Sequence, residues 1–290
     1  MSRKLPVTVI VPAYNAAPYL AVTLEAIREQ TRPPERVFVV DDGSTDDTAA
    51  IAEGLGADVI RQHQQGPGAA RNRGIEAAET EFVAFCDSDD WYVPDKLERA
   101  VDQLDKFSAG CSATDAWIVR EDRIEGRKNE NRTVPNVLTL EFLLRGNPVI
   151  CSSVVARKQA VLDAGGFDES PDLIATEDYD LWLRMSVREP IAYNPRPMTF
   201  YRVHSGSLSA NTRFLRGVES ILARMAKQHE GEAHFQNLIR RRRAAVRLDV
   251  AWDLIGERRF GEALTVIGEA QKLAPTWKGF KMRLRSMLRR

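Results

Sequence analysis

The sequence has no apolar run long enough to cross a bilayer. A transmembrane helix needs roughly 20 consecutive apolar residues, and no uninterrupted run approaches that length although 43% of the 290 residues are hydrophobic. The start of the chain, MSRKLPVTVI, passes directly into a strand-like segment without the pattern of a signal peptide. We therefore expect a globular protein with a large buried core, located in the cytoplasm.

Cysteine is also scarce. The chain has three cysteines, Cys86, Cys111 and Cys151, which are widely spaced and set in apolar surroundings. An odd number at such spacings is not typical of a disulfide framework or of a zinc site. We expect three buried thiols without a functional role.

Net charge is absent overall, but the charges are unevenly distributed. The chain has 41 Lys and Arg and 41 Asp and Glu, yet residues 240–290 carry 14 basic and 5 acidic side chains. Residues 1–239 are correspondingly acidic. The basic segment favours an anionic partner, although the four arginines at 240–243 are more typical of a solvated helix face. A nucleic-acid partner is not expected.

The first third of the sequence alternates between strand-like and helix-like segments. Apolar, β-branched runs lie at 5–14, 36–40, 57–62 and 81–86, and helical patterns lie at 19–30, 48–56 and 66–79. Ser44 and Thr45 are predicted to cap the second helix, and Gly66, Pro67 and Gly68 to open the third. This alternation predicts a parallel sheet covered by helices. Ligands bind such sheets beyond the carboxyl ends of the strands, where the clusters DDGSTDD and DSDD fall.

The DSDD cluster follows an apolar strand. Carboxylates crowded at the end of a buried strand repel one another unless a cation, hydrogen-bond donors or a proton relieves them. Oxygen ligands at positions i and i+2, such as Asp87 and Asp89, suit Mg²⁺ or Mn²⁺ bound together with substrate phosphates. Alternatively, Asp87, Ser88 or Asp89 could cap the helix that includes VPDKLERAVDQL, in which Asp95 is typical of a first turn. The motif alone leaves both interpretations open.

Six segments occur in an order that resembles family 2 glycosyltransferases of the GT-A fold. They are VTVIVPAYNAAPYL, VVDDGSTDDT, GPGAARNRGIEAAETEFVAFCDSDDWYVPDKL, GGFDES, EDYDLWLRM and YRVHSGSLS. The resemblance covers residues 5 to about 210. It implies an α/β GT-A domain over residues 1–210, which is Rossmann-like with a mainly parallel central sheet and flanking helices. A helical C-terminal region with a basic amphipathic tail is expected over residues 211–290.

The activity that the resemblance implies is transfer of a sugar, with inversion, from a nucleotide diphosphate sugar to an acceptor hydroxyl. A hexosyl- or N-acetylhexosaminyltransferase is expected. The segment that matches VPAYN would line the base pocket with Tyr14 beside the base, and Asp42 would accept a hydrogen bond from a uracil N–H, which favours a UDP-sugar. The implied nucleotide-binding residues are Pro12, Tyr14, Asn15, Asp42, Arg71 and Asp87. The alternatives are a turn carboxylate for Asp42 and a surface helix residue for Arg71.

The resemblance also implies a metal site for Mn²⁺ or Mg²⁺. Asp89 would ligate the metal directly, Asp87 would lie in the ribose and metal region, and His204 would flank the diphosphate. A metal bound there would neutralise charge on the leaving group.

The catalytic base is the remaining implied role. Asp178 matches the carboxylate that takes the proton of the acceptor hydroxyl. Glu177 and Trp182 are predicted on the acceptor side. The alternative, compatible with the first, is that Glu177 and Asp178 begin the helix that carries Trp182.

The C-terminal segment is predicted to be helical, with a hairpin broken near Gly256. In PTWKGFKMRLRSMLRR, one helix face can hold Trp277, Phe280, Leu284, Met287 and Leu288, with basic residues outside it. This pattern is typical of a helix at an anionic membrane surface. We therefore expect a peripheral protein on the inner face of the plasma membrane, with a glycan or lipid-linked acceptor. Its expected role is the assembly of bacterial-type cell-surface polysaccharide or glycolipid.

Two other functions remain open. The chain could be a catalytically silent nucleotide-sugar or glycan-binding module of the same fold, although the joint presence of Asp42, Asp87, Asp89, Asp178 and His204 argues against this. It could also be a sugar nucleotidyltransferase. That enzyme is expected to carry a glycine-rich, basic loop after its first strand, where this chain has VPAYNAAPYL.

Overall fold

The computed structural model describes residues 4–204 and 212–287. Two compact units divide the chain. The first comprises residues 1–140, 148–169 and 177–207, and the second comprises 141–147, 170–176 and 208–290. The second unit is thus mainly C-terminal, but it also takes two short segments from within the preceding sequence. The predicted domain over residues 1–210 contained both of these segments, whereas the contacts group them with the second unit.

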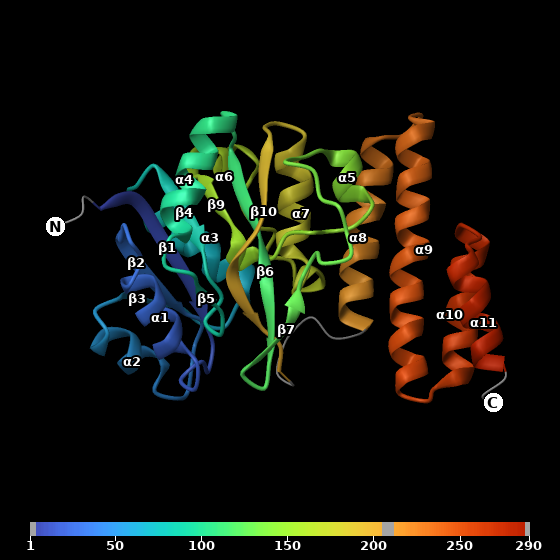
Figure 1. The fold of residues 1–290 in the computed structure, drawn as a ribbon, viewed down its shortest axis with the longest axis horizontal. Helices are drawn as coiled ribbons and strands as arrows, with labels where there is room; N and C mark the ends of the chain where they lie inside the picture. Colours follow the sequence, from blue (N-terminus) through green and yellow to red (C-terminus); the bar gives the residue numbers. More distant parts are fainter. Residues whose placement is uncertain (1–3, 205–211, 288–290) are drawn as a thin grey trace. The chain divides into compact units, whose positions relative to one another are not determined.

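A single sheet forms the centre of the first unit (Figure 1). In the described residues its strand order is β3-β2-β1-β4-β9-β6-β10-β5, with β7 paired to β6 and β8 to β10. Pairs β1–β2, β2–β3, β1–β4 and β6–β10 are parallel, whereas β9 runs antiparallel to β4 and β6. The strands are β1 (Leu5–Ala13), β2 (Pro34–Asp41), β3 (Asp58–Arg61), β4 (Phe82–Phe85), β5 (Trp91–Tyr92), β6 (Cys111–Arg120), β7 (Arg123–Arg127), β8 (Val137–Leu138), β9 (Val155–Arg157) and β10 (Ile191–Arg202). The predicted α/β fold with a mainly parallel sheet is confirmed.

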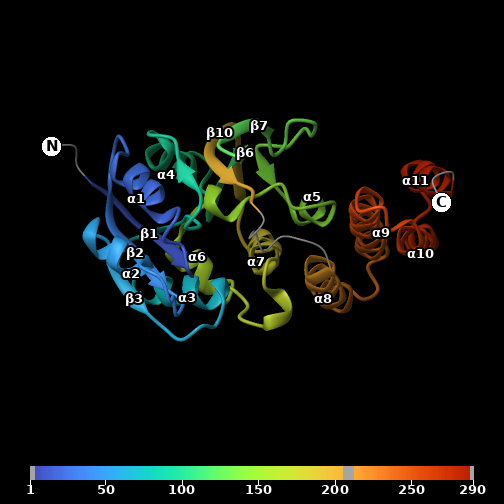
Figure 2. The ribbon, with the colours of Figure 1, turned by 90° about the horizontal axis from the view of Figure 1, so that it is seen from below.

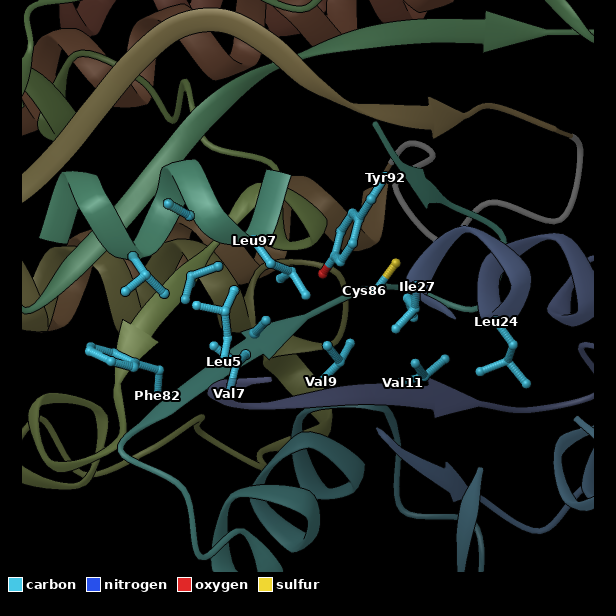
Figure 3. Packing of buried hydrophobic residues seen from close by; sticks show 14 of the residues in the cluster. Leu5, Val7, Val9, Val11, Leu24, Ile27, Phe82, Cys86, Tyr92 and Leu97 are labelled. Atoms are coloured by element: carbon cyan, nitrogen blue, oxygen red, sulfur yellow. The ribbon is translucent and has the colours of Figure 1, made fainter. Parts of the chain in front are cut away.

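Helices cover both faces of this sheet. They are α1 (Leu20–Arg28), α2 (Thr48–Gly54), α3 (Pro67–Ala77), α4 (Lys96–Phe107), α6 (Lys158–Asp163) and α7 (Glu177–Ser186), with the 3₁₀ turn η1 (Cys151–Ser153). Strand β1 needs helices on both faces of the sheet, because its apolar side chains alternate between the two faces. Val7, Val9 and Val11 join the cluster that includes residues of α1 and α4 (Figure 3).

Helix α3 packs against the opposite face of β1. A Cβ atom on Gly74 would lie 2.5 Å from Cγ2 of Ile10. Only glycine therefore allows α3 to approach the strand this closely. The three cysteines are buried and free, as predicted.

The predicted caps of the second helix are wrong. Helix α2 follows Asp47, which makes no side-chain capping hydrogen bond. The hydroxyl of Ser44 instead accepts a hydrogen bond from the Asn15 backbone N–H at 2.9 Å, and the Thr45 N–H donates to Oδ1 of Asn15 at 2.8 Å. These hydrogen bonds tie the loop after β2 to the turn that follows β1, so Ser44 and Thr45 bond to Asn15 rather than capping α2.

The alternative that a residue of DSDD caps the following helix is also wrong. Helix α4 begins after Asp95 rather than after any residue of the DSDD cluster. A turn and the short strand β5 separate the cluster from this helix. Its carboxylates therefore need partners other than the N-terminus of α4.

Lys96, at the start of α4, is completely buried. Its Nζ donates to the carbonyl oxygen of Ser153 at 3.0 Å and lies 4.8 Å from the centre of the Tyr92 ring. Burial lowers the pKa of Lys96 to about 7, because the charged amine loses its hydration. Nearby Cys86 and Cys111 act in the opposite direction but more weakly.

We predict that Lys96→Met flattens the pH dependence of stability between about pH 7 and pH 10. In the unfolded chain the lysine has its ordinary pKa of about 10.4. Through this window the unfolded state binds more protons than the folded state, so the stability of the parent protein rises with pH. Urea unfolding at several pH values measures the slope. Lys106→Met, an exposed change on the same helix, should keep the parental slope, and an unchanged slope in Lys96→Met would contradict the prediction.

The second unit is helical (Figures 1 and 2). Its elements are α5 (Leu140–Leu144), which begins at the unit boundary, η2 (Pro171–Leu173), α8 (Thr212–Gln228), α9 (Ala233–Gly256), α10 (Phe260–Leu273) and α11 (Trp277–Met287). The predicted break near Gly256 is confirmed. One apolar cluster joins α9, α10 and α11: Ala244, Leu248, Ala251, Leu254, Ile255, Ala263, Ile267, Ala270 and Met282. None of the helices in the described part of the chain has the length and apolar character needed to span a membrane.

Candidate functional site

Both acidic clusters lie at the carboxyl ends of parallel strands, as predicted. Strand β2 ends at Asp41, and Asp42 follows it. Strand β4 ends at Phe85, two residues before Asp87. Because β2 and β4 both run parallel to β1, their carboxyl ends meet at the same edge of the sheet. This edge is where α/β sheets bind ligands.

Asp42 is buried and holds the loop after β3. Its Oδ1 accepts hydrogen bonds from Nε2 of Gln62 at 2.7 Å and from the Gln65 N–H at 2.8 Å. Its Oδ2 accepts one from the Gly66 N–H at 2.8 Å. In this structure Asp42 is therefore a loop-anchoring carboxylate whose partners lie beyond its own turn. Its role as a reader of uracil stays a prediction.

The segment at the end of β1 presents one open aromatic ring. Pro12 is buried, whereas Tyr14 is 47% exposed. Asn15 has a φ of 49°, in the left-handed region that asparagine tolerates better than most residues. Its hydrogen bonds to the loop after β2 stabilise this turn, in which the Tyr14 ring stays exposed.

Arg71 of α3 joins two acidic segments. Its Nη2 donates to Oδ1 of Asp87 at 2.6 Å, and its Nη1 donates to Oε1 of Glu177 at 2.7 Å. The guanidinium lies 5.2 Å from the centre of the Phe167 ring. Arg71 is buried, so the surface-residue alternative is wrong, whereas Arg73 is exposed.

Asp178 occupies the first turn of α7 and is half-buried. Its Oδ1 accepts a hydrogen bond from the Tyr179 N–H at 2.6 Å. Burial and the negative charge of Glu177 raise the pKa of Asp178 to about 7, while Arg71 opposes the shift. Asp178 begins a helix, as the alternative interpretation held, and a pKa of about 7 is also compatible with the predicted role of general base.

The two residues predicted on the acceptor side have different surroundings. Glu177 is buried, and its Oε2 has no hydrogen-bond partner within the described residues. Trp182 is fully buried, with its ring centre 6.4 Å from that of Phe85 and 6.2 Å from that of Phe167. Trp182 thus supports α7 from the core and exposes no surface to an acceptor. The reason is that seven of the ten residues of α7 are buried, so the helix presents little surface to solvent.

Asp89 and Asp90 have separate roles in the DSDD turn. Oδ2 of Asp89 lies 2.9 Å from Nε2 of His204, whose ring stacks on Tyr19 at a centroid distance of 5.0 Å. Burial and the charge of Asp87 raise the pKa of Asp89, while His204 opposes the shift. Asp90 is fully buried and accepts a hydrogen bond from the Arg202 N–H at 2.9 Å. Asp90 therefore anchors the turn.

Sequence reasoning missed two residues that hold this turn. The hydroxyl of Ser152 accepts a hydrogen bond from the Asp87 N–H at 2.9 Å. The guanidinium of Arg202 donates to the Asp89 carbonyl at 3.2 Å and lies 4.8 Å from the Trp91 ring centre. Arg202 lies in the YRVH motif, so its position two residues before His204 was an available signal. Ser152 had no comparable signal, because serine is common in loops.

The predicted metal ligands have suitable chemistry but are not gathered into one cluster. In the ranges that the structure describes, no group of three or more His, Cys, Asp or Glu side chains is placed to hold an ion. Asp87 faces Arg71, and Asp89 faces His204. Mg²⁺ and Mn²⁺ are commonly held by one or two carboxylates together with substrate phosphates. Two carboxylates and an imidazole are therefore donors of the kind that such an ion takes, although their placement alone does not form a complete site.

We predict that Arg71→Gln destabilises the first unit by about 3–5 kcal/mol, because it leaves the Glu177 and Asp87 carboxylates without their buried cation. Arg73→Gln is the matched control on the same helix, and its exposed position predicts a change within about 0.5 kcal/mol. Chemical denaturation of both variants measures the difference. Equal stabilities of the two variants would show that the Arg71 bridge is not structurally important.

The fold is an α/β fold of the GT-A type, and its clustered carboxylates lie at the carboxyl edge of the sheet. The family described as glycosyl transferase family 2 matches residues 8–166, more than half of the chain. The chain belongs to this family and is a glycosyltransferase. Asp178 and His204 lie beyond the matched residues, so their roles depend on the geometry above.

Several known proteins are similar to this chain. It is 29% identical over 210 residues to the UDP-Glc:alpha-D-GlcNAc-diphosphoundecaprenol beta-1,3-glucosyltransferase WfaP of Escherichia coli, covering 71% of this chain and 80% of that protein. It is 29% identical over 212 residues to the putative teichuronic acid biosynthesis glycosyltransferase TuaG of Bacillus subtilis, covering 71% and 82%. The crystal structure of S. aureus TarS 1–349 in complex with UDP-GlcNAc covers 99% of this chain and 89% of that chain, at 21% identity and a TM-score of 0.70. This last likeness is one of fold.

Proposed function

We propose that the protein transfers a hexose or an N-acetylhexosamine from a UDP-sugar to an acceptor hydroxyl, with inversion at the anomeric carbon and Asp178 as the base. The observation that supports this most is the Asp87–Arg71–Glu177 bridge beside Asp178. The bridge joins a carboxylate on the nucleotide side to the helix turn that carries a carboxylate of pKa about 7. Acceptor activation and donor binding would thus share one buried cation.

The donor assignment has two sources of support. One relative is named for UDP-glucose, and a structure of similar fold holds UDP-GlcNAc. In this chain, the exposed ring of Tyr14 lies at the carboxyl end of β1, where a base could stack. Asp42 would need to exchange one of its loop hydrogen bonds, or to use a remaining lone pair, to contact uracil.

The base assignment follows from protonation state and position. An inverting displacement needs a carboxylate that is ionised when the hydroxyl attacks and that can then hold the proton. With a pKa of about 7, Asp178 is suited to both steps near neutral pH. Glu177 has one oxygen bound to Arg71 and one without a partner in the described part of the chain, so it could accept a hydrogen bond from the acceptor.

The leaving group would be handled by the DSDD turn. Asp87, Asp89 and His204 would hold Mn²⁺ or Mg²⁺, which when bound neutralises negative charge on the departing diphosphate. The pKa of Asp89 is raised because burial and the charge of Asp87 disfavour its ionised form. A bound cation would offset both effects and favour the ionised carboxylate. Arg202 and Ser152 position this turn through backbone hydrogen bonds.

The names of the relatives support a role in cell-surface polysaccharide assembly. One names a diphosphoundecaprenol-linked acceptor, and the other names teichuronic acid biosynthesis. We propose that this chain acts on a lipid-linked or glycan acceptor in bacterial polysaccharide or glycolipid assembly. A lipid-linked acceptor would place the reaction at the inner face of the plasma membrane. Family membership argues against the sugar nucleotidyltransferase alternative.

We predict different kinetic defects for substitutions at the two sides of the site. Asp178→Asn should reduce turnover by roughly 10²–10⁴-fold while donor affinity is kept, because only the base is removed. Asp89→Asn should weaken donor binding and make it insensitive to manganese. UDP release with an acceptor present, together with calorimetry of UDP binding with and without manganese, separates these effects. Near-parental turnover of Asp178→Asn would rule out the base assignment, and absence of any UDP release by the parent would favour the silent binding module.

We predict that turnover rises with pH through about pH 7, because the ionised form of Asp178 is the active base. The negative charge of Glu177 raises the pKa of Asp178, so Glu177→Gln should move this rise to lower pH. The direction follows because removing a nearby negative charge favours the ionised carboxylate. A pH profile of UDP release measures the shift, with Glu76→Gln, an exposed change on α3, as the control. A shift to higher pH would contradict the assignment.

A further inference from the structure

Helix α11 has a packed face and, on its opposite side, an exposed apolar face. With 3.6 residues per turn, positions 279, 282 and 286 fall on one side of the helix. These residues are buried, and a Cβ on Gly279 would lie 2.0 Å from the side chain of Gln271, so α11 packs closely against α10. The opposite side is 46–67% exposed and consists of Trp277, Phe280, Leu284 and Met287. Packing within the second unit therefore leaves a full apolar face uncovered.

Trp252 of α9 adds to this exposed surface. It is 52% exposed, and the guanidinium of Arg285 lies 5.4 Å from its ring centre. Two hollows, of about 460 and 450 Å³, adjoin it and share Trp252 and Arg285 in their walls. Phe260 lines the first, and Trp277 and Lys281 line the second. We call the five exposed residues the α11 patch: Trp252, Trp277, Phe280, Leu284 and Met287.

The α11 patch is an unusual concentration of exposed apolar surface for this chain. Eleven large hydrophobic side chains are exposed among the described residues, and the patch contains five of them. The other six belong to the first unit. Apart from Tyr14, which belongs to the candidate site, they are typical of an ordinary protein surface. A contiguous exposed patch, by contrast, is typical of an interaction site.

Basic side chains accompany the patch. Helix α11 carries four cations and no acid: Lys278, Lys281, Arg283 and Arg285. Lys278 pairs with Asp249 at 3.0 Å. Within the described ranges, Lys281, Arg283 and Arg285 form no ion pair, although Lys281 lies 5.5 Å from the centre of the Trp277 ring. The patch thus combines apolar rings with cations that are open to an anionic partner.

We propose that the α11 patch docks reversibly on an anionic lipid bilayer. Trp277 and Phe280 would enter the interfacial region, where aromatic side chains are favoured, while Lys281, Arg283 and Arg285 would face lipid phosphates. A second copy of the chain fits less well, because self-pairing of this face would bring like charges together. One short helix face is sufficient for shallow, reversible binding and is too small for stable insertion. This surface is separate from sugar transfer, so its failure would leave the transfer proposal intact.

Vesicle flotation of the full chain tests the proposal. The parent should bind vesicles of phosphatidylcholine with phosphatidylglycerol, should bind pure phosphatidylcholine weakly, and should lose affinity as salt increases. The double variant Trp277→Ser with Phe280→Ser should bind the anionic vesicles at least about tenfold more weakly, because two interfacial rings are removed. The matched control is Ile124→Ser with Val187→Ser, two similarly exposed apolar residues of the first unit, and it should bind like the parent.

A second variant separates charge from apolar contact. Lys281→Gln with Arg285→Gln should reduce binding to anionic vesicles and flatten its salt dependence, whereas Arg73→Gln, an exposed change elsewhere, should not. Thermal unfolding and UDP affinity should be unchanged in all variants, since the substituted side chains are exposed and outside the site. The proposal would be overturned if the parent did not bind anionic vesicles. It would also be overturned if Trp277→Ser with Phe280→Ser and Lys281→Gln with Arg285→Gln both bound them as tightly as the parent does. A different result would assign the patch to a second copy of the chain. In that case the parent would not bind vesicles, and light scattering would show a parental dimer that is lost in Trp277→Ser with Phe280→Ser.

Discussion

The site depends on one buried guanidinium. Arg71 lies in α3 and hydrogen-bonds to Asp87 after β4 and to Glu177 at the start of α7. Burying carboxylates at the edge of a sheet is costly unless a cation compensates them, and Arg71 is the cation that contacts both segments. The planar guanidinium can donate to two carboxylates at once, which a lysine amine would do with less geometric definition. Through this bridge, the positions of the DSDD turn and of Asp178 become linked.

The carboxylates of the site differ because their neighbours differ. Asp87 and Glu177 each accept a short charge-assisted hydrogen bond from Arg71. Asp178 accepts a backbone N–H instead, and burial together with the charge of Glu177 raises its pKa. One cation therefore keeps its immediate partners paired and leaves the adjacent carboxylate able to exchange a proton near neutral pH.

Small residues set how closely the helices approach in both units. Gly74 lets α3 approach β1 at Ile10, and Gly279 lets α11 approach α10 at Gln271. The first contact positions the helix that carries Arg71. The second directs the larger side chains of α11 away from its packed face. In both places, the absence of a Cβ atom decides how closely the helix packs against its neighbour.

The sequence by itself determined the elements of the first third of the chain, the helical character of its C-terminal segment and the edge of the sheet where the candidate site lies. The alternation of β-branched runs with helical patterns predicted the parallel sheet, and parallel strands necessarily bring the acidic clusters to the same edge. The motifs indicated the family, and the apolar periodicity predicted the helix break near Gly256. These properties are local, because each depends on the burial of one face of one segment.

Only the tertiary structure decided which polar groups share a buried space. The Arg71–Glu177 bond joins residues 106 positions apart, and the Asp90–Arg202 bond joins residues 112 positions apart. Likewise, Ser44 bonds across to the end of β1 rather than capping α2, and Trp182 packs in the core rather than facing an acceptor. A periodic pattern tells which side of a segment is buried, but not what lies opposite. That depends on strand order and helix crossings, which bring distant residues together after the local elements have formed.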